Sequence, residues 1–161
     1  MKQTIFTPDP DKHTLLVERE FDAGLEQVWQ AWTDSDILAK WWAPHPFKAI
    51  TKKMDFRPGG QWHYYMLGPD GSKFWCMAYY LEVDPLKRYT QEDIFCDEEG
   101  INTNQLPEMH WENTFTQSGT GTTVRVNITY KSKADMETIL SMGFKEGFAA
   151  AHNNLDELLA Q

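Results

Sequence analysis

The C-terminal segment of the chain carries the longest regular pattern of apolar positions. Apolar side chains recur there every three or four residues, at Met136, Leu140, Phe144, Phe148, Ala151, Leu155 and Leu158 or Leu159. This spacing places them on one stripe of an α-helix. Ser132 precedes the stripe and can cap the first free N–H groups. We therefore expect one helix over residues 134–159, about 40 Å long at 1.5 Å per residue.

Two glycines, Gly143 and Gly147, interrupt this apolar stripe. Each weakens a helix by about 1 kcal/mol relative to alanine, so each needs a compensating reason. Glycine allows a helix to pack closely against a sheet, which is the commonest use of such a residue. Alternatively, the missing side chains leave open volume that a ligand fills. The sequence leaves both interpretations open.

Alternation of apolar and polar residues predicts β-strands over most of the remaining chain. The predicted strands cover residues 13–21, 47–56, 61–67, 73–83, 88–96, 109–117 and 122–130. Residues 68–71 and 118–121 are typical of the turns in β-hairpins. Two short helices are expected after the first strand. Asp22 would cap one over residues 25–32, and Asp34 or Ser35 would start the other.

This order of elements predicts an α+β fold. Consecutive strands joined by hairpin turns form an antiparallel sheet, and a sheet of seven strands would curl. The long C-terminal helix would fill the concave face of this sheet. Residues 1–12 contain Pro8 and Pro10 and are expected to form an extended N-terminal arm. Residues 13–161 have the length of a single domain.

The charge balance of the chain disfavours several classes of partner. Its 24 acidic and 15 basic residues give a net charge of -9, whereas nucleic acids and anionic membranes bind basic surfaces. We therefore expect no nucleic-acid partner. No segment reaches the roughly 20 apolar residues of a membrane span, and the N-terminus lacks the apolar core of a signal peptide. The expected location is the cytoplasm.

The sequence contains no motif that would hold a metal ion or a cofactor, so we expect neither. Cys76 and Cys96 have no histidine nearby at zinc-ligand spacing. The P-loop, dinucleotide-binding and Ser–His–Asp patterns are also missing. No two acidic or histidine residues stand at a spacing that forces them together, so the sequence identifies no catalytic residue.

Several motifs resemble a known family. These motifs are Asp22-Ala23, Trp29, Trp32-Thr33, Trp41-Trp42-Ala43-Pro44 and Arg57-Pro58-Gly59-Gly60. They resemble bacterial proteins related to the activator of the heat-shock-chaperone ATPase, in the START-like (SRPBCC) superfamily of the birch-pollen allergen and aromatic polyketide cyclases. The resemblance covers residues 14–159. It implies a helix-grip fold: a curved seven-stranded sheet around the C-terminal helix, with a hydrophobic cavity between them.

Strand alternation identifies the side chains that would line this cavity. If Trp62, Tyr64 and Met66 face the helix, then the alternate residues of the strand over 73–83 do so as well. The family usually has glycine at Ala78, so alanine there would narrow the cavity. The predicted ligand-binding residues are Trp42, Trp62, Tyr64, Met66, Phe74, Cys76, Ala78, Tyr80, Gln91, His110, Phe144, Gly147 and Phe148. The polar tips of Tyr64, Tyr80, Gln91 and His110 would orient a ligand, although the same row could equally be plain core.

The opposite face of the strand over residues 73–83 is apolar as well. Trp75, Met77 and Tyr79 lie on it, whereas a sheet that faces water should be polar on that side. Either the N-terminal arm covers this row or a second copy of the chain does, as a homodimer.

The leading functional hypothesis is the binding of a small, largely hydrophobic molecule in the cavity. One alternative is an enzyme of the cyclase or hydrolase kind that uses the same cavity. Another, which rests on the family resemblance, is a regulator that interacts with a chaperone.

Overall fold

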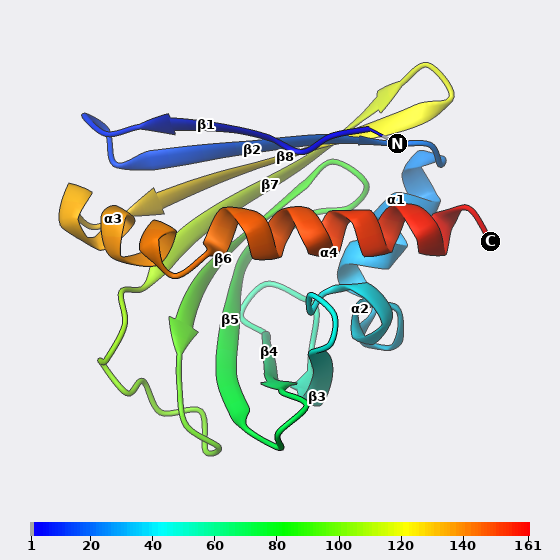
Figure 1. Ribbon diagram of the computed structural model, residues 1–161. Helices are drawn as coiled ribbons and strands as arrows, with labels where there is room; N and C mark the ends of the chain where they lie inside the picture. Colours follow the sequence, from blue (N-terminus) through cyan, green and yellow to red (C-terminus); the bar gives the residue numbers. More distant parts are fainter. Residues whose placement is uncertain (1) are drawn as a thin grey trace.

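The computed structural model describes residues 2–161, and an eight-stranded sheet and four helices lie within them (Figure 1). The elements are β1 (Ile5–Asp9), β2 (Thr14–Phe21), α1 (Leu25–Thr33), α2 (Ser35–Trp41), β3 (Lys48–Met54), β4 (Gln61–Leu67), β5 (Lys73–Asp84), β6 (Arg88–Phe95), β7 (Met109–Ser118), β8 (Gly121–Tyr130), α3 (Lys133–Ser141) and α4 (Phe144–Leu159). The strand order is β1-β2-β8-β7-β6-β5-β4-β3, and every neighbouring pair is antiparallel.

The sheet curves around α4, which crosses its concave face (Figure 1). Helices α1 and α2 lie at one end of α4 and α3 lies at the other. The predicted α+β helix-grip fold is confirmed. Its core forms where the apolar sides of the strands meet the helices, and the largest side chains fully enclosed there include Trp32 and Trp41.

The sheet has eight strands rather than seven, because the predicted N-terminal arm is itself a strand. Residues Ile5–Asp9 form β1 and pair with β2, so that Phe6 lies opposite Val17. Pro8 is tolerated because β1 is an edge strand, where a missing N–H costs no ladder hydrogen bond. Since β1 lies at the far edge of the sheet from β5, it does not cover the outer row that contains Trp75.

The prediction of one continuous helix over residues 134–159 is wrong, because the chain breaks between α3 and α4. Gly143 adopts a φ of 83° at this break. This left-handed conformation costs an L-residue with a side chain roughly 1–2 kcal/mol, whereas glycine adopts it freely. The start of the helical segment is as predicted, since Ser132 Oγ accepts a hydrogen bond from the Asp135 N–H at 3.1 Å.

Only one of the two other predicted caps is present. The Asp34 side chain accepts hydrogen bonds from the N–H groups of Asp36 and Ile37, which fixes the start of α2. At α1 the capping position is Gly24 and no side chain bonds to the free N–H groups, so the prediction of Asp22 as a cap is wrong. The chain turns into α1 through a glycine with extended backbone, and Asp22 lies two residues before this capping position.

Helix α2 is tied to both of its neighbours. The Trp41 indole Nε1–H donates to the Ala31 carbonyl of α1 at 2.9 Å. The Asn154 side chain of α4 donates to the carbonyls of Trp41 and Ala43 at 3.4 and 3.2 Å. These bonds satisfy carbonyls that the end of a helix leaves without partners. They also hold Trp42, the next residue after α2, between the sheet and α4.

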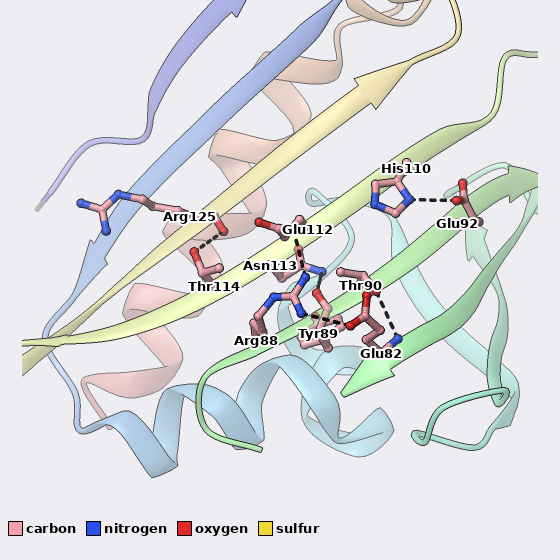
Figure 2. Close-up of polar contacts among 10 residues, drawn as sticks. All are labelled: Glu82, Arg88, Tyr89, Thr90, Glu92, His110, Glu112, Asn113, Thr114 and Arg125. Atoms are coloured by element: carbon pink, nitrogen blue, oxygen red, sulfur yellow. Dashed lines mark hydrogen bonds and ion pairs between the residues drawn. The ribbon is translucent and has the colours of Figure 1, made fainter. Parts of the chain in front are cut away.

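The outer face of the sheet is polar where β6, β7 and β8 lie side by side. Arg88 contacts Glu82 at 3.4 Å and Glu112 at 3.0 Å, and His110 lies 2.8 Å from Glu92 (Figure 2). Such exposed pairs contribute little to stability. Their alternation with buried residues of the same strands is typical of an antiparallel sheet with one face in water.

The outer face of β5 is covered in part by the chain itself. Met77 is 3% exposed, and it packs with Ile94 and Cys96 beneath the loop that follows β6. Gly100 of this loop lies so close that an added Cβ would be 2.7 Å from the Met77 Cε. Tyr79, by contrast, is 37% exposed. A local loop therefore covers the middle of the row that was expected beneath an arm or a second copy.

Candidate functional site

A cavity of about 390 Å³ lies between the concave face of the sheet and the N-terminal half of α4. Its walls come from the residues that follow α2, from β4, β5, β6 and β7, from the loop between β6 and β7 and from the α3–α4 segment, and all but a few of the side chains are apolar. The lining residues are Trp42, Pro44, Tyr64, Met66, Phe74, Cys76, Met77, Asp93, Ile94, Phe95, Leu106, Met109, Trp111, Ile139, Met142, Phe144, Gly147 and Phe148. Met77 and Ile94 border the cavity although they belong to the outer-face cluster with Cys96. Two of them, Phe74 and Met142, are 54% and 51% exposed, so the cavity has an apolar rim.

Gly147 explains part of the open volume. A Cβ built on this residue would meet only one atom within 4 Å, the Cγ of Pro44 at 3.7 Å, which is an ordinary contact. Close packing against the sheet therefore does not require glycine here. Of the two interpretations, open volume fits Gly147, whereas Gly143 serves the turn between α3 and α4.

Aromatic side chains fill the other half of the concave face. Trp29 of α1 packs edge-on against Phe56 and Phe115, with ring centroids 5.9 and 5.0 Å apart. Tyr80 packs against the same Phe56 at 4.8 Å. Ala78, which is 2% exposed, belongs to the apolar core and does not line the cavity. The cavity is thus confined to the end of the sheet that α1 and its aromatic partners do not reach.

The cavity wall beside α2 is fixed by hydrogen bonds and ring stacking. The Trp42 Nε1–H donates to the Tyr64 hydroxyl at 3.0 Å. The Tyr64 ring stacks on Trp62, with centroids 3.8 Å apart and planes 19° apart. Trp62 lies behind this wall, and its Nε1–H donates to Thr51 Oγ1 at 3.0 Å. Burial raises the pKa of Tyr64, so its hydroxyl stays protonated at neutral pH.

The structure brings most of the predicted site residues together. Those that line the cavity are Trp42, Tyr64, Met66, Phe74, Cys76, Phe144, Gly147 and Phe148. Trp62, Ala78 and Tyr80 are core residues next to it. Gln91 is also buried and does not line the cavity. His110 points to the outer face, where its Nδ1 lies 2.8 Å from Glu92, so it is not placed to orient a ligand.

Asp93 lines the cavity but is absent from the set predicted from the sequence. It lies on β6 opposite Ala78 of β5 and Met109 of β7. Gln91 Nε2 donates to its Oδ1 at 2.6 Å. Burial in apolar surroundings raises the pKa of the Asp93 carboxyl to about 7, and the nearby Glu92 charge adds to this shift. Strand alternation from Gln91 indicates the same face, so the signal was present in the sequence.

The thiol of Cys76 is unreactive at neutral pH. Burial raises its pKa to about 12, so it stays protonated at neutral pH. It lies 3.7 Å from the Phe74 carbonyl, which is a weak thiol hydrogen bond. The thiolate is the reactive form of cysteine, so Cys76 is not a nucleophile here. It serves as a polarizable side chain in the cavity wall.

His152 lies outside the cavity, in a buried polar cluster between α4 and β2. Its Nδ1 lies 2.9 Å from Thr4 Oγ1, and Thr4 in turn accepts a hydrogen bond from Arg19 at 2.8 Å. Arg19 is itself buried and forms an ion pair with Asp156 of α4. Burial lowers the pKa of His152 to about 3, with a further contribution from the Arg19 charge. The cluster fixes α4 on the sheet.

Two further features bear on the kind of site. Within residues 2–161, no group of three or more His, Cys, Asp or Glu side chains is arranged to hold a metal ion. None of the helices in this part of the chain has the length and apolarity needed to cross a membrane.

A curved antiparallel sheet closed by a C-terminal helix over an apolar cavity defines the helix-grip class of fold. The chain belongs to the family described as Activator of Hsp90 ATPase homolog 1-like protein, whose sequence model matches residues 22–160. A search of curated proteins finds no match.

Solved structures of bacterial proteins share this fold over nearly the whole chain. Protein Ms6760 from Mycobacterium smegmatis is 34% identical, with a TM-score of 0.90, and the match covers 98% of this chain and 96% of that one. A protein from Arthrobacter aurescens is 28% identical, with a TM-score of 0.91 and coverages of 97% and 91%. Protein NE0264 from Nitrosomonas europaea is 25% identical, with a TM-score of 0.80 and coverages of 93% and 96%.

Proposed function

We propose that this protein binds a small, largely hydrophobic molecule in the cavity between α4 and the sheet. The observation that carries the proposal is the cavity itself, about 390 Å³ in volume and walled almost entirely by apolar side chains. Its size lies within the range of small-molecule sites, which are mostly apolar with a few polar groups. The exposed side chains of Phe74 and Met142 make the rim of the cavity apolar as well, which also favours an apolar ligand.

The expected affinity follows from apolar burial. Removing apolar surface from water contributes about 25 cal/mol per Å², and the bound molecule gives up translational freedom in return. A rigid two-ring hydrocarbon would therefore bind with a dissociation constant on the order of micromolar, about -8 kcal/mol.

The test is a titration of ¹⁵N-labelled protein with 2-methylnaphthalene, followed through the indole N–H signals of the tryptophans. Trp42 and Trp111 line the cavity and should shift with saturation. Trp75 lies on the other face of the sheet, half-buried against His63 and Tyr65, and serves as an internal control.

Two substitutions at one position separate cavity binding from other effects. Gly147→Leu places a large side chain in the cavity and should abolish the saturable shift. Gly147→Ala changes helix propensity similarly, fills little space and should retain binding. Equal shifts at all tryptophans, or no shift at Trp42 and Trp111, would contradict the proposal.

Self-association through the outer face of β5 stays a prediction. Its motivation is the partly exposed side chains of Trp75 and Tyr79, although Met77 between them is covered by the chain's own loop. A Trp75→Lys variant that elutes from size exclusion at the same volume as the parent would speak against a homodimer.

A further inference from the structure

The cavity contains a single charged side chain, which sets a chemical requirement on its ligand. Asp93 is the one carboxyl among the lining residues, and none of them is a lysine, arginine or histidine. The remaining polar side chains are the Tyr64 hydroxyl, the Cys76 thiol and the indole groups of Trp42 and Trp111. The Tyr64 hydroxyl already accepts a hydrogen bond from Trp42. The Trp111 indole N–H is buried without a partner among the described residues, but it can only donate. Asp93 is therefore the free acceptor of the site and its one anionic group.

The Asp93 carboxyl has one satisfied oxygen and one free oxygen. Gln91 Nε2 donates to Oδ1 at 2.6 Å, which fixes the rotation of the carboxyl. Within residues 2–161, no hydrogen bond or ion pair reaches Oδ2. A half-buried carboxylate in apolar surroundings with one neutral donor is poorly stabilised, so a ligand that supplied a second donor, to Oδ2, would lower its cost. Because Gln91 holds Oδ1, the free Oδ2 is already oriented as a hydrogen-bond acceptor in an apolar wall.

We propose that the ligand is an apolar amine whose protonated nitrogen donates to Asp93 while its hydrocarbon part fills the cavity. This inference rests on the proposed function and specifies the ligand class for the same site. An ammonium group supplies both the opposite charge and the donor, and charge-assisted hydrogen bonds are the strong ones. The net charge of -9 also raises the local concentration of cations around the protein.

Anionic ligands are the disfavoured class. A carboxylate or sulfonate in this cavity would meet no basic side chain and would lie close to Asp93. Like charges in an apolar cavity repel strongly, because little water is present to screen them. The site should therefore select against hydrophobic acids of the same size and shape.

The preference for amines should depend on pH through Asp93 alone. The titratable groups that face Asp93 or adjoin it are Tyr64 of β4, Cys76 and Tyr80 of β5, and Tyr89 and Glu92 of β6. Burial raises the pKa of each of these phenols and of the thiol, so they stay neutral through the physiological range. Glu92 points to the outer face, towards His110. The β7 neighbours of this region, Met109 and Trp111, do not titrate.

The experiment compares matched two-ring probes by the same tryptophan titration at about pH 8. The probes are 2-methylnaphthalene, 2-naphthylmethylamine and 2-naphthoate. We expect the amine to bind about tenfold tighter than the hydrocarbon, and the acid about tenfold weaker or not at all. The advantage of the amine should shrink as the pH falls through about 7 towards 5.5, because Asp93 then takes up a proton.

Two variants locate the effect. Asp93→Asn keeps the shape of the side chain and should reduce the amine-to-hydrocarbon affinity ratio about tenfold. Glu92→Gln neutralises the adjacent carboxyl on the outer face. At about pH 8, where Asp93 is already mostly ionised, it should leave that ratio nearly unchanged.

The outcomes separate this inference from the proposed function. If 2-methylnaphthalene binds and the amine shows no advantage, or if Asp93→Asn leaves the ratio unchanged, only the inference is overturned. Tighter binding of 2-naphthoate than of the amine would overturn it as well. If none of the probes shifts Trp42 or Trp111, both the inference and the proposed function fail.

Discussion

Two glycines four residues apart play different physical roles in this protein. Gly143 has a φ of 83° and turns the chain between α3 and α4, whereas Gly147 lies inside α4 and faces open volume. The sequence indicates neither role, because glycine has no side chain whose polarity could reveal its surroundings. Only the backbone conformation and the neighbouring atoms distinguish the two positions.

Alanine at these two positions should change stability in opposite directions. Gly147→Ala should stabilise the protein by about 1 kcal/mol, because the new Cβ meets only Pro44 at 3.7 Å and alanine favours helix. Gly143→Ala should destabilise it by about 1 kcal/mol or more, because alanine resists a left-handed backbone. Urea unfolding of the two variants measures both values. Shifts of the same sign would contradict the assigned roles.

Asp93 should make stability fall as the pH rises. Its ordinary pKa of 3.8 applies to the unfolded chain, whereas burial raises the pKa to about 7 in the folded protein. The folded state therefore holds a proton that the unfolded state has released between these values, and stability is lost from about pH 4 up to about pH 7. The upper limit is about 4 kcal/mol at 1.4 kcal/mol per pKa unit, and access of water through the cavity reduces it.

Asp93→Asn removes this titration and provides the measurement. The difference in unfolding free energy between the variant and the parent should grow in favour of the variant from pH 4 to pH 8. A difference that stays constant over this range would show that the Asp93 carboxyl is not in apolar surroundings.

At the scale of elements, α4 is held on the sheet by a buried polar cluster that reaches the N-terminus. Arg19 of β2 pairs with Asp156 of α4 and donates to Thr4, and Thr4 contacts His152 of α4. The cluster therefore connects the first residues of the chain, the second strand and the last helix. Phe148 lies one turn before His152, with ring centroids 4.3 Å apart, so the same anchoring fixes a wall of the cavity.

The cluster should make the protein sensitive to acid. Burial lowers the pKa of His152 from 6.5 to about 3. Between these pH values the unfolded chain binds a proton at this histidine that the folded protein does not bind. The stability that the neutral histidine supports is present above about pH 6.5 and is lost as the pH falls towards 3. At pH 4.5 the loss should be about 3 kcal/mol, since two pKa units correspond to that amount.

His152→Gln tests this loss, because glutamine is polar and does not titrate. The parent should lose about 3 kcal/mol more than the variant between pH 7 and pH 4.5 in urea unfolding. Acidic residues that titrate in the same range are common to both proteins, so their contributions to the pH dependence cancel in the difference. Parallel pH profiles would contradict the assignment.

At the scale of the whole molecule, the sequence predicted the architecture well and the site in part. The strand over residues 61–67 was predicted with the bounds that β4 has, because its flanking turns contain glycine and proline. Strand alternation also placed Phe74 and Cys76 on the cavity side. It could not tell which end of that face stays open, because α1 and its aromatic partners fill the end around Tyr80 through long-range packing.

Most of the remaining errors have the same origin. His110 was misplaced because its face depends on the register with β6, where it lies opposite Glu92. Asp93 was missed although alternation within its own strand places it on the same face as Gln91. The N-terminal residues looked like a free arm because Pro8 and Pro10 disfavour a central strand, yet an edge strand tolerates proline. Local patterns therefore identified the elements, whereas partner strands and helices decided which residues meet.

The central claim is that a small apolar molecule occupies the space between α4 and the sheet. An isotope-filtered NOE experiment on the complex with 2-methylnaphthalene tests this most directly, because it reports contacts within about 5 Å of the ligand. The account predicts NOEs from the ligand to the methyl groups of Met66 and Met109 and to the ring of Phe148. NOEs to Leu81 or Ile101, which are exposed apolar residues away from the cavity, or no NOE to the cavity methyl groups, would contradict it.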